Sequence, residues 1–159
     1  AQEKFADLKE KQQNLELHFT GTLQTNKIKQ AISLFDVFHT IFREKQLVEF
    51  SKYSEQISRK EFLIQVNTGL EENKGGLSPQ EVEEFVRGAI NNYNIKVVGL
   101  MCIPPINDSP TKHFMILKNL KEKLKLTKLS MGMSDDYKEA IDCESDYLRI
   151  GTMLFGERS

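Results

Sequence analysis

The stretch from residue 61 to residue 103, EFLIQVNTGLEENKGGLSPQEVEEFVRGAINNYNIKVVGLMCI, decides the fold. It begins with EFLIQVN over 61–67 and ends with IKVVGLMCI over 95–103, two nearly continuous apolar runs. Such runs are typical of parallel strands buried on both faces, because strands with one solvated face alternate polar and apolar residues. The stretch therefore predicts two buried parallel strands.

The segment between these runs predicts a helix. Ser78-Pro79-Gln80-Glu81 combines a capping box with a proline at the first helical position, which is typical of a helix start. The apolar residues that follow recur at helical spacing and predict one buried face, made of Val82, Phe85, Val86, Ala89 and Ile90. A strand, a helix and a second strand in this order predict a βαβ unit.

The same alternation extends along the chain in both directions. Further strands are predicted over a segment ending at Gly21 and over 35–41, 127–133 and 147–156. About six strands therefore alternate with helices, which predicts a parallel α/β fold. The periodicity does not distinguish a doubly wound sheet from a barrel. Helices are predicted over 2–15, 23–32, 43–57, 114–124 and 134–143.

The composition indicates a single globular domain and excludes several classes of partner. The chain has 159 residues, of which 39% are hydrophobic and 28% charged, and its formal net charge is −1. Without a basic excess, nucleic acid is not the expected partner, and no apolar run is long enough to span a membrane. Cys102 and Cys143 lack metal-type spacing, which favours a reducing, cytoplasmic location.

Ligand-binding and catalytic residues of parallel α/β folds lie at the carboxyl ends of the strands. Two of the segments that follow predicted strands are informative here. Met-Gly-Met-Ser, ending at Ser134, leads from a strand into a helix start, where backbone N–H groups and a hydroxyl favour an anion. Arg-Ile-Gly-Thr offers the guanidinium of Arg149, close backbone approach at Gly151 and the hydroxyl of Thr152. Together they suit a phosphorylated cofactor better than a metal.

Each of these residues also has a purely structural interpretation. Ser134 suits a helix N-cap, Arg149 an ion pair, Gly151 a tight turn and Asn26 a loop cap. His39, on an apolar strand, is more typical of a hydrogen-bonded core histidine than of a ligand. The three histidines show no zinc-type spacing, and no nucleophile elbow, dinucleotide-binding or P-loop motif is present.

Five segments together resemble one family, the pyridoxal phosphate homeostasis proteins. They are HFTGTLQTNKIK, FLIQVNTGLEENKGG, VVGLMCIPP, LSMGMSDDYKEAI and YLRIGTMLFGER, and they follow one another in order over residues 18–158. The resemblance implies a TIM-type (β/α)8 barrel of the alanine racemase N-terminal-domain kind, with about six of its eight βα units in this chain. It also implies a non-catalytic protein that carries or buffers pyridoxal 5′-phosphate (PLP) in vitamin B6 homeostasis. A monomer is expected, with PLP-dependent apoenzymes as recipients of the cofactor.

The resemblance also assigns roles to individual residues. Ser134, Gly151 and Thr152 would hold the phosphate, and Arg149 would reach the ring nitrogen or the phosphate. Two more residues would lie near the ring, Asn26 and Met131. The Schiff-base lysine is expected in an N-terminal segment that precedes this sequence, so residues 1–159 are interpreted as one incomplete PLP-binding domain.

Two residues depart from the family pattern. Phe42 stands where an aspartate is common, which predicts an altered contact at the rim. Glu144 stands where a glycine is common, which predicts a more demanding turn before the last strand.

An enzyme is the alternative from a different class. A PLP-dependent amino-acid racemase or lyase needs a positioned acid or base, and no such constellation is evident in the sequence. The tyrosines at 53, 93, 137 and 147 are interpreted as packing residues. A third possibility is a remnant of the family with a binding or regulatory role alone.

Overall fold

The computed structural model describes residues 14–156, and its centre is a curled parallel sheet. Its strands pair in chain order, each parallel to the next. They are β1 (His18–Phe19), β2 (Val37–Ile41), β3 (Glu61–Val66), β4 (Val97–Cys102) and β5 (Lys128–Ser130). A doubly wound sheet reverses its strand order at a switch point, whereas this order never reverses. The fold is therefore of the barrel kind, and we call the curled sheet the half-barrel.

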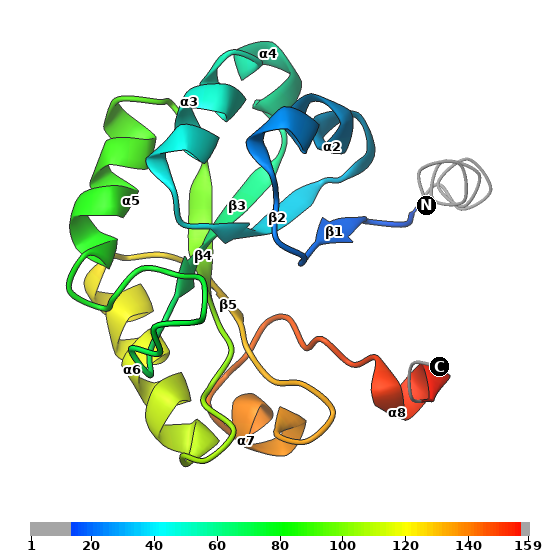
Figure 1. The fold of residues 1–159 in the computed structure, drawn as a ribbon, viewed down its shortest axis with the longest axis vertical. Helices are drawn as coiled ribbons and strands as arrows, with labels where there is room; N and C mark the ends of the chain where they lie inside the picture. Colours follow the sequence, from blue (N-terminus) through cyan, green and yellow to red (C-terminus); the bar gives the residue numbers. More distant parts are fainter. Residues whose placement is uncertain (1–13, 157–159) are drawn as a thin grey trace.

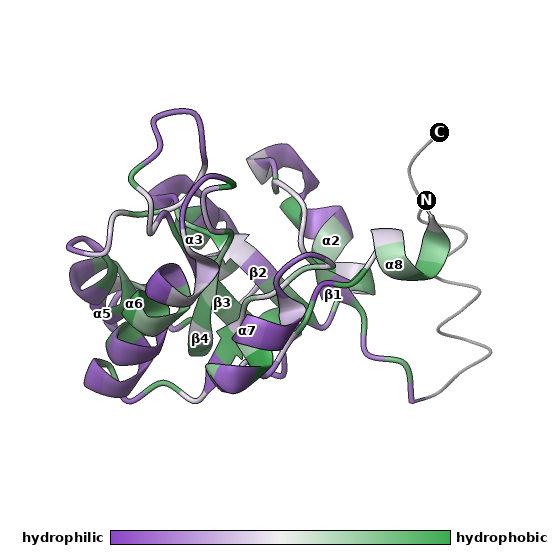
Figure 2. Cartoon of the chain, turned by 90° about the horizontal axis from the view of Figure 1, so that it is seen from below, coloured by the Kyte–Doolittle hydropathy of each residue, from purple (hydrophilic) through white to green (hydrophobic). Residues whose placement is uncertain are grey.

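All helices except the last form an arc around the outside of the half-barrel, and the last one lies apart from the sheet (Figure 1). The helices are η1 (Thr25–Lys27), α2 (Ile28–Leu34), α3 (Glu44–Ser51), α4 (Ser54–Ile57), α5 (Val82–Asn91), α6 (Pro110–Lys123), α7 (Tyr137–Asp142) and α8 (Thr152–Phe155). Figure 2 shows apolar strands in the interior and hydrophilic residues on the outer helices. Within residues 14–156, no helix is long and apolar enough to cross a membrane.

The alternation of side chains along the strands separates two cores. Phe38 and Ile64 belong to the larger cluster, which fills the layer between sheet and helices. Val37 and Leu63 belong to a smaller cluster with Val98 and Met101. Because neighbours in a strand point to opposite faces, this smaller cluster lies on the concave face of the sheet. β2 and β4 are buried throughout, as the apolar runs predict for strands covered on both sides.

The structure corrects several predicted boundaries. The helix predicted over 43–57 is interrupted between α3 and α4, and the strand predicted over 147–156 contributes one parallel bridge, Ser130 to Tyr147, before α8 begins. The described residues thus contain five strands rather than six. Ile90, predicted on the buried face of α5, is 44% exposed. The helix predicted over 2–15 lies almost entirely outside the described residues.

The turn after α7 is strained at Glu144, as predicted from the glutamate that stands there in place of the family's glycine. Glu144 has a φ of 65°, in the left-handed region that glycine adopts without cost. The N–H of Ser145 donates to the carbonyl of Ala140, and the N–H of Glu144 donates to that of Ile141. This pattern is a Schellman motif, whose left-handed position is usually glycine. The Glu144 carboxylate also pairs with Lys118 Nζ at 2.7 Å.

We therefore expect Glu144→Gly to stabilise the protein. Removing the side chain relieves the left-handed strain, which outweighs the loss of an ion pair exposed to solvent. The melting temperature should rise by about 2–4 °C, measured by calorimetry. Glu144→Ala is the matched control, because it removes the ion pair and keeps the strain. An equal rise in both variants would mean that the carboxylate, and not the backbone, is unfavourable.

Candidate functional site

Arg149 lies at the centre of the candidate site, where it joins the ends of two strands. Its Nη1 donates to the hydroxyl of Ser130 on β5 at 2.7 Å, and its Nη2 donates to the carbonyl of Cys102 at the end of β4, also at 2.7 Å. The bridge between Ser130 and Tyr147 brings this part of the chain beside β5. The guanidinium is thus held by two strands and not by a single loop.

The hydroxyl of Ser130 extends this arrangement across the concave face to β2. His39 Nδ1 lies 2.8 Å from Ser130 Oγ, and both residues are fully buried. His39 Nε2 lies 2.9 Å from Nδ1 of His18 on β1, whose Nε2 lies 2.6 Å from a carboxylate oxygen of Glu16. His39 is therefore a buried histidine with hydrogen bonds on both ring nitrogens, as its place on an apolar strand suggests.

The two edges of the half-barrel approach each other through aromatic rings. Tyr147 packs edge-on against His18 on β1, with ring centroids 4.9 Å apart, and against His39, at 5.4 Å. It also packs against the smaller core on the concave face. Tyr147 is thus a packing residue, as interpreted from the sequence, but it also lines the cavity described below.

Burial determines the charge state of these groups. The pKa of His39 is lowered to about 3, chiefly because burial penalises the imidazolium, with further contributions from His18 and Arg149. Burial also lowers the pKa of Arg149 below its ordinary value, although a guanidinium stays protonated at neutral pH. Arg149 is consequently a fixed cation beside a neutral imidazole.

A cavity of about 590 Å³ opens beside this arrangement, and its size is ordinary for a ligand site. His18 and His39 line it from the β1 side, and Tyr147, Arg149 and Gly151 line it from the opposite side. A Cβ atom at Gly151 would meet nothing within 4 Å, so the backbone there faces open space. The cavity thus combines a fixed cation with accessible main chain.

The structure brings part of the predicted phosphate site together. Ser134 Oγ accepts a hydrogen bond from the N–H of Met153 at 3.4 Å, which places it beside the start of α8, where Gly151 is the N-cap and Thr152 the first residue. The prediction that Ser134 caps the following helix is wrong, because α7 begins after Asp136. Instead, Asp136 Oδ1 accepts from the N–H of Met133 at 2.6 Å.

Two other predicted site residues lie elsewhere. Met131 is fully buried and belongs to the larger core outside the sheet, not to the cluster on the concave face. Asn26 is exposed in η1, after β1, at the opposite end of the strand order from Arg149. Their proximity to a cofactor ring remains a prediction, as do the roles of the other predicted residues.

Phe42 contacts the loop that follows β3, and the altered rim contact stays a prediction. A Cβ atom at Gly75 would lie 2.8 Å from the Phe42 ring, so the ring packs directly on the loop that follows β3. Arg43 Cζ lies 4.9 Å from the centroid of the same ring, within the range of a cation–π contact.

The sequence interpretation missed the pairing of His18 with His39 and the role of Ser130. Spacing along the chain cannot reveal these contacts, because they join residues 21 and 91 positions apart. The available signal was His39 itself, a polar residue on an otherwise apolar strand. It directly follows Phe38, which faces the helices, so its side chain must point to the opposite face of the sheet. Among residues 14–156, no group of three or more His, Cys, Asp or Glu side chains is arranged to hold a metal ion.

Comparison with known proteins identifies the family of this chain. Residues 5–159 match the model of the alanine racemase N-terminal domain. The pyridoxal phosphate homeostasis protein of Aquifex aeolicus is 39% identical over 156 residues, covering 91% of this chain and 68% of the relative. The protein of the same name from Synechocystis is 35% identical, covering 92% of this chain and 72% of the relative.

This chain belongs to the pyridoxal phosphate homeostasis proteins, of the alanine racemase N-terminal-domain family.

Solved structures agree on the fold of this family. PipY of Synechococcus elongatus PCC7942 superimposes with a TM-score of 0.78 without PLP and 0.77 with PLP bound, at 24% and 22% identity. Each comparison covers 98% of this chain and 79% of PipY. An alanine racemase of Clostridium difficile 630, in complex with cycloserine, superimposes at 0.74 and 11% identity, covering 99% of this chain and 46% of the racemase. At these identities the likeness establishes the fold alone.

The lowered pKa of His39 predicts how stability depends on pH. The folded state binds fewer protons than the unfolded state between about pH 3 and 6.5, so the free energy of unfolding falls as the pH drops through this window. We expect the wild type to lose a few kcal/mol more between pH 7 and 4 than His39→Asn, which has no imidazole to titrate. Urea unfolding at a series of pH values measures the difference, and parallel pH profiles would contradict a buried neutral His39.

Proposed function

We propose that this chain binds PLP and acts as a carrier or buffer of PLP in vitamin B6 homeostasis, without catalysing turnover. The observation that carries the proposal is the Arg149 guanidinium, fixed by Ser130 and Cys102 beside the cavity. Membership of the pyridoxal phosphate homeostasis family supports it. The chemistry of the donors fits, because a phosphorylated pyridine is an acceptor and Arg149 only donates hydrogen bonds.

The residues near the start of α8 fit the phosphate group. Ser134 and Thr152 supply hydroxyl groups, and Gly151 leaves the main chain open to an approaching anion. We assign the phosphate to these three residues and the ring nitrogen to Arg149. Asn26 and Met131 keep their proposed places near the ring, and the lysine that would bind PLP covalently is proposed to precede this sequence.

When bound, PLP supplies an electrophilic aldehyde and an electron-accepting ring. Arg149 would weaken the second property, because a cation beside the ring nitrogen disfavours its protonation. A ring that accepts electrons poorly suits storage and delivery better than the chemistry of a lyase or transaminase.

The titratable groups that line the cavity are poorly suited to acid–base catalysis, because most of them have hydrogen-bond partners within the protein. Both ring nitrogens of His39 and of His18 have partners, and Asp146 accepts from the N–H of Leu129 at 2.7 Å. Burial raises the pKa of Tyr147, which makes its phenolate scarce at neutral pH. A racemase or lyase needs an acid or base tuned near the working pH, so we favour the carrier.

The remaining assignments are proposals of the same kind. We propose a reducing, cytoplasmic compartment, because Cys102 and Cys143 are both free and buried. A monomer is proposed as well. Burial raises the pKa of the Cys102 thiol to about 12, so it is chemically inert at neutral pH. PLP-dependent apoenzymes are the proposed recipients of the cofactor.

Titration calorimetry with PLP and with pyridoxine 5′-phosphate tests the proposal. Pyridoxine 5′-phosphate lacks the aldehyde, so its binding reports the non-covalent contacts alone. We expect the wild-type chain to bind both, and Arg149→Gln to bind both at least about tenfold more weakly. Arg87→Gln is the matched control, because Arg87 lies on α5 and pairs only with an exposed glutamate.

Two outcomes would contradict the proposal. One is a wild-type chain that binds neither compound. The other is binding of PLP alone, with a borohydride-stable adduct on one lysine of this chain, which would mean that a different site holds the cofactor. Circular dichroism of Arg149→Gln separates loss of binding from loss of the fold, and Arg149→Lys should restore part of the affinity because it keeps the charge.

A further inference from the structure

Five groups form an unbroken line of short contacts from the cavity to the surface. The line runs from Arg149 to Ser130, on to His39 and His18, and ends at the carboxylate of Glu16. Its four contacts measure 2.7, 2.8, 2.9 and 2.6 Å. Ser130 and His39 are fully buried, whereas the side chain of Glu16 is 57% exposed.

Counting protons gives this line a single direction. A guanidinium has only donors, so Ser130 Oγ must accept from Arg149. The one hydroxyl hydrogen of Ser130 can then donate to His39 Nδ1, which requires that this nitrogen carry no proton. A neutral His39 keeps its proton on Nε2 and donates it to His18 Nδ1. His18 in turn donates from Nε2 to Glu16, so every group finds its partner.

The reverse direction is unfavourable for two physical reasons. A proton on His39 Nδ1 would point at Ser130, whose own hydrogen would then lack this acceptor inside the sheet. A doubly protonated His39 would be a buried cation, and burial is the main reason that the pKa of His39 is lowered to about 3, with smaller contributions from His18 and Arg149. The geometry and the charges therefore agree on one tautomer.

We propose that Ser130, His39 and His18 are positioning residues, whose one-directional relay of hydrogen bonds holds the Arg149 guanidinium in place for the ring nitrogen of the ligand. This rests on the proposed function, because it assigns to the relay the affinity of that same site. The buried hydroxyl of Ser130 accepts a hydrogen bond from Nη1 of Arg149 and so fixes the position of the guanidinium. Arg149 then has fewer rotamers to lose when a ligand binds, so more of the contact energy contributes to affinity.

The first experiment uses the chain without ligand. Nitrogen-15 NMR of labelled histidine distinguishes the two neutral tautomers and the imidazolium. We expect His39 to be the Nε2–H tautomer and to remain neutral from pH 7.5 down to pH 5. An Nδ1–H tautomer, or an imidazolium in this range, would overturn the relay.

The second experiment separates positioning from a general structural role. Ser130→Ala removes the hydroxyl, whereas Ser130→Thr keeps it. We expect Ser130→Ala to bind PLP about tenfold more weakly, and Ser130→Thr to recover most of that loss. The probe is 1-deazapyridoxal 5′-phosphate, which has carbon in place of the ring nitrogen, and its affinity should be the same in wild type and Ser130→Ala.

The possible outcomes are distinct. Equal weakening for both ligands would mean that Ser130→Ala disturbs the whole site, and unchanged affinity for PLP would mean that Arg149 is held without Ser130; either result overturns the proposal. A wild-type chain that binds neither ligand contradicts the proposed function itself, and the tautomer measurement then decides the relay on its own.

Discussion

The buried hydrogen bond between His39 and Ser130 is the constraint on which the arrangement of the site depends. It joins β2 to β5 across the concave face, over two intervening strands and 91 positions of sequence. A parallel sheet has strong directional bonds only between neighbouring strands, so its curvature is otherwise determined by packing. A direct polar contact between β2 and β5 lowers the free energy of the one curvature at which His39 and Ser130 can meet. The same hydroxyl then receives the Arg149 guanidinium, so curvature and site geometry are linked.

The two faces of the sheet have opposite chemistry, and that contrast explains where function is located. The layer under the helices is almost wholly apolar and contains the stacked ring pair Phe38 and Phe62, with centroids 5.4 Å apart. The concave face has a small apolar cluster and a line of polar groups that satisfy one another. Buried polar groups are costly unless they are all paired, and in this line each has a partner. The helix layer therefore stabilises the fold, and the concave face supplies polar groups that line the cavity.

Sequence patterns predicted those parts of the structure whose signal is local. The apolar runs predicted β3 and β4, and the positions at strand ends predicted Arg149 and Gly151 as cavity residues. The apolar face after Glu81 predicted α5, but the helix begins at Val82 with Glu81 as its N-cap, so the start predicted at Ser78-Pro79 is three residues too early. The failures are equally physical. Ser134 looks like a cap, but its hydroxyl accepts from Met153, a contact that only the return of the chain creates. Tyr147 begins a strand-like sequence, yet one bridge is all it forms, because the following residues turn into α8.

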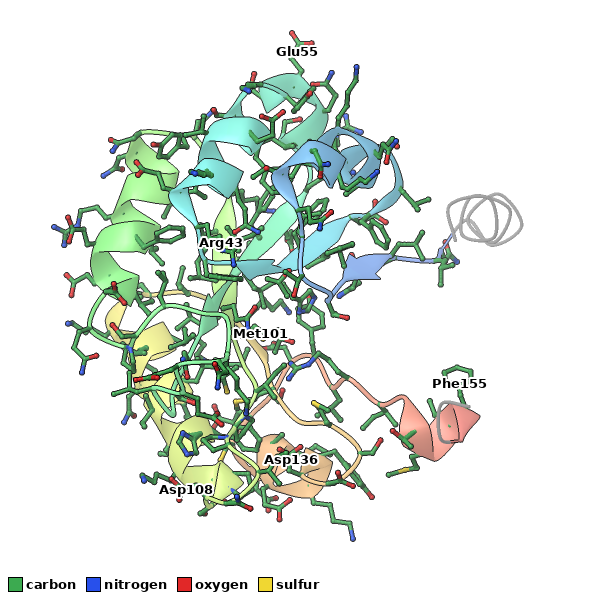
Figure 3. All side chains as sticks on the ribbon, in the orientation of Figure 1. Arg43, Glu55, Met101, Asp108, Asp136 and Phe155 are labelled. Carbon is green, nitrogen blue, oxygen red and sulfur yellow. The ribbon has the colours of Figure 1, made fainter. Side chains whose placement is uncertain are left out.

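The two ends of the half-barrel contribute to a single cavity, which couples ligand binding to the curl of the sheet. His18 lies on β1, Arg149 follows β5, and the rings of His18 and Tyr147 touch across the interior. Beyond them, α8 carries Phe155 away from the sheet, 86% exposed (Figure 3). Flattening of the sheet would separate the wall that holds the cation from the wall that holds the imidazoles. A ligand that contacts both walls must therefore favour the curled form, and it stabilises that form by an amount that grows with the logarithm of the ratio of its concentration to its Kd.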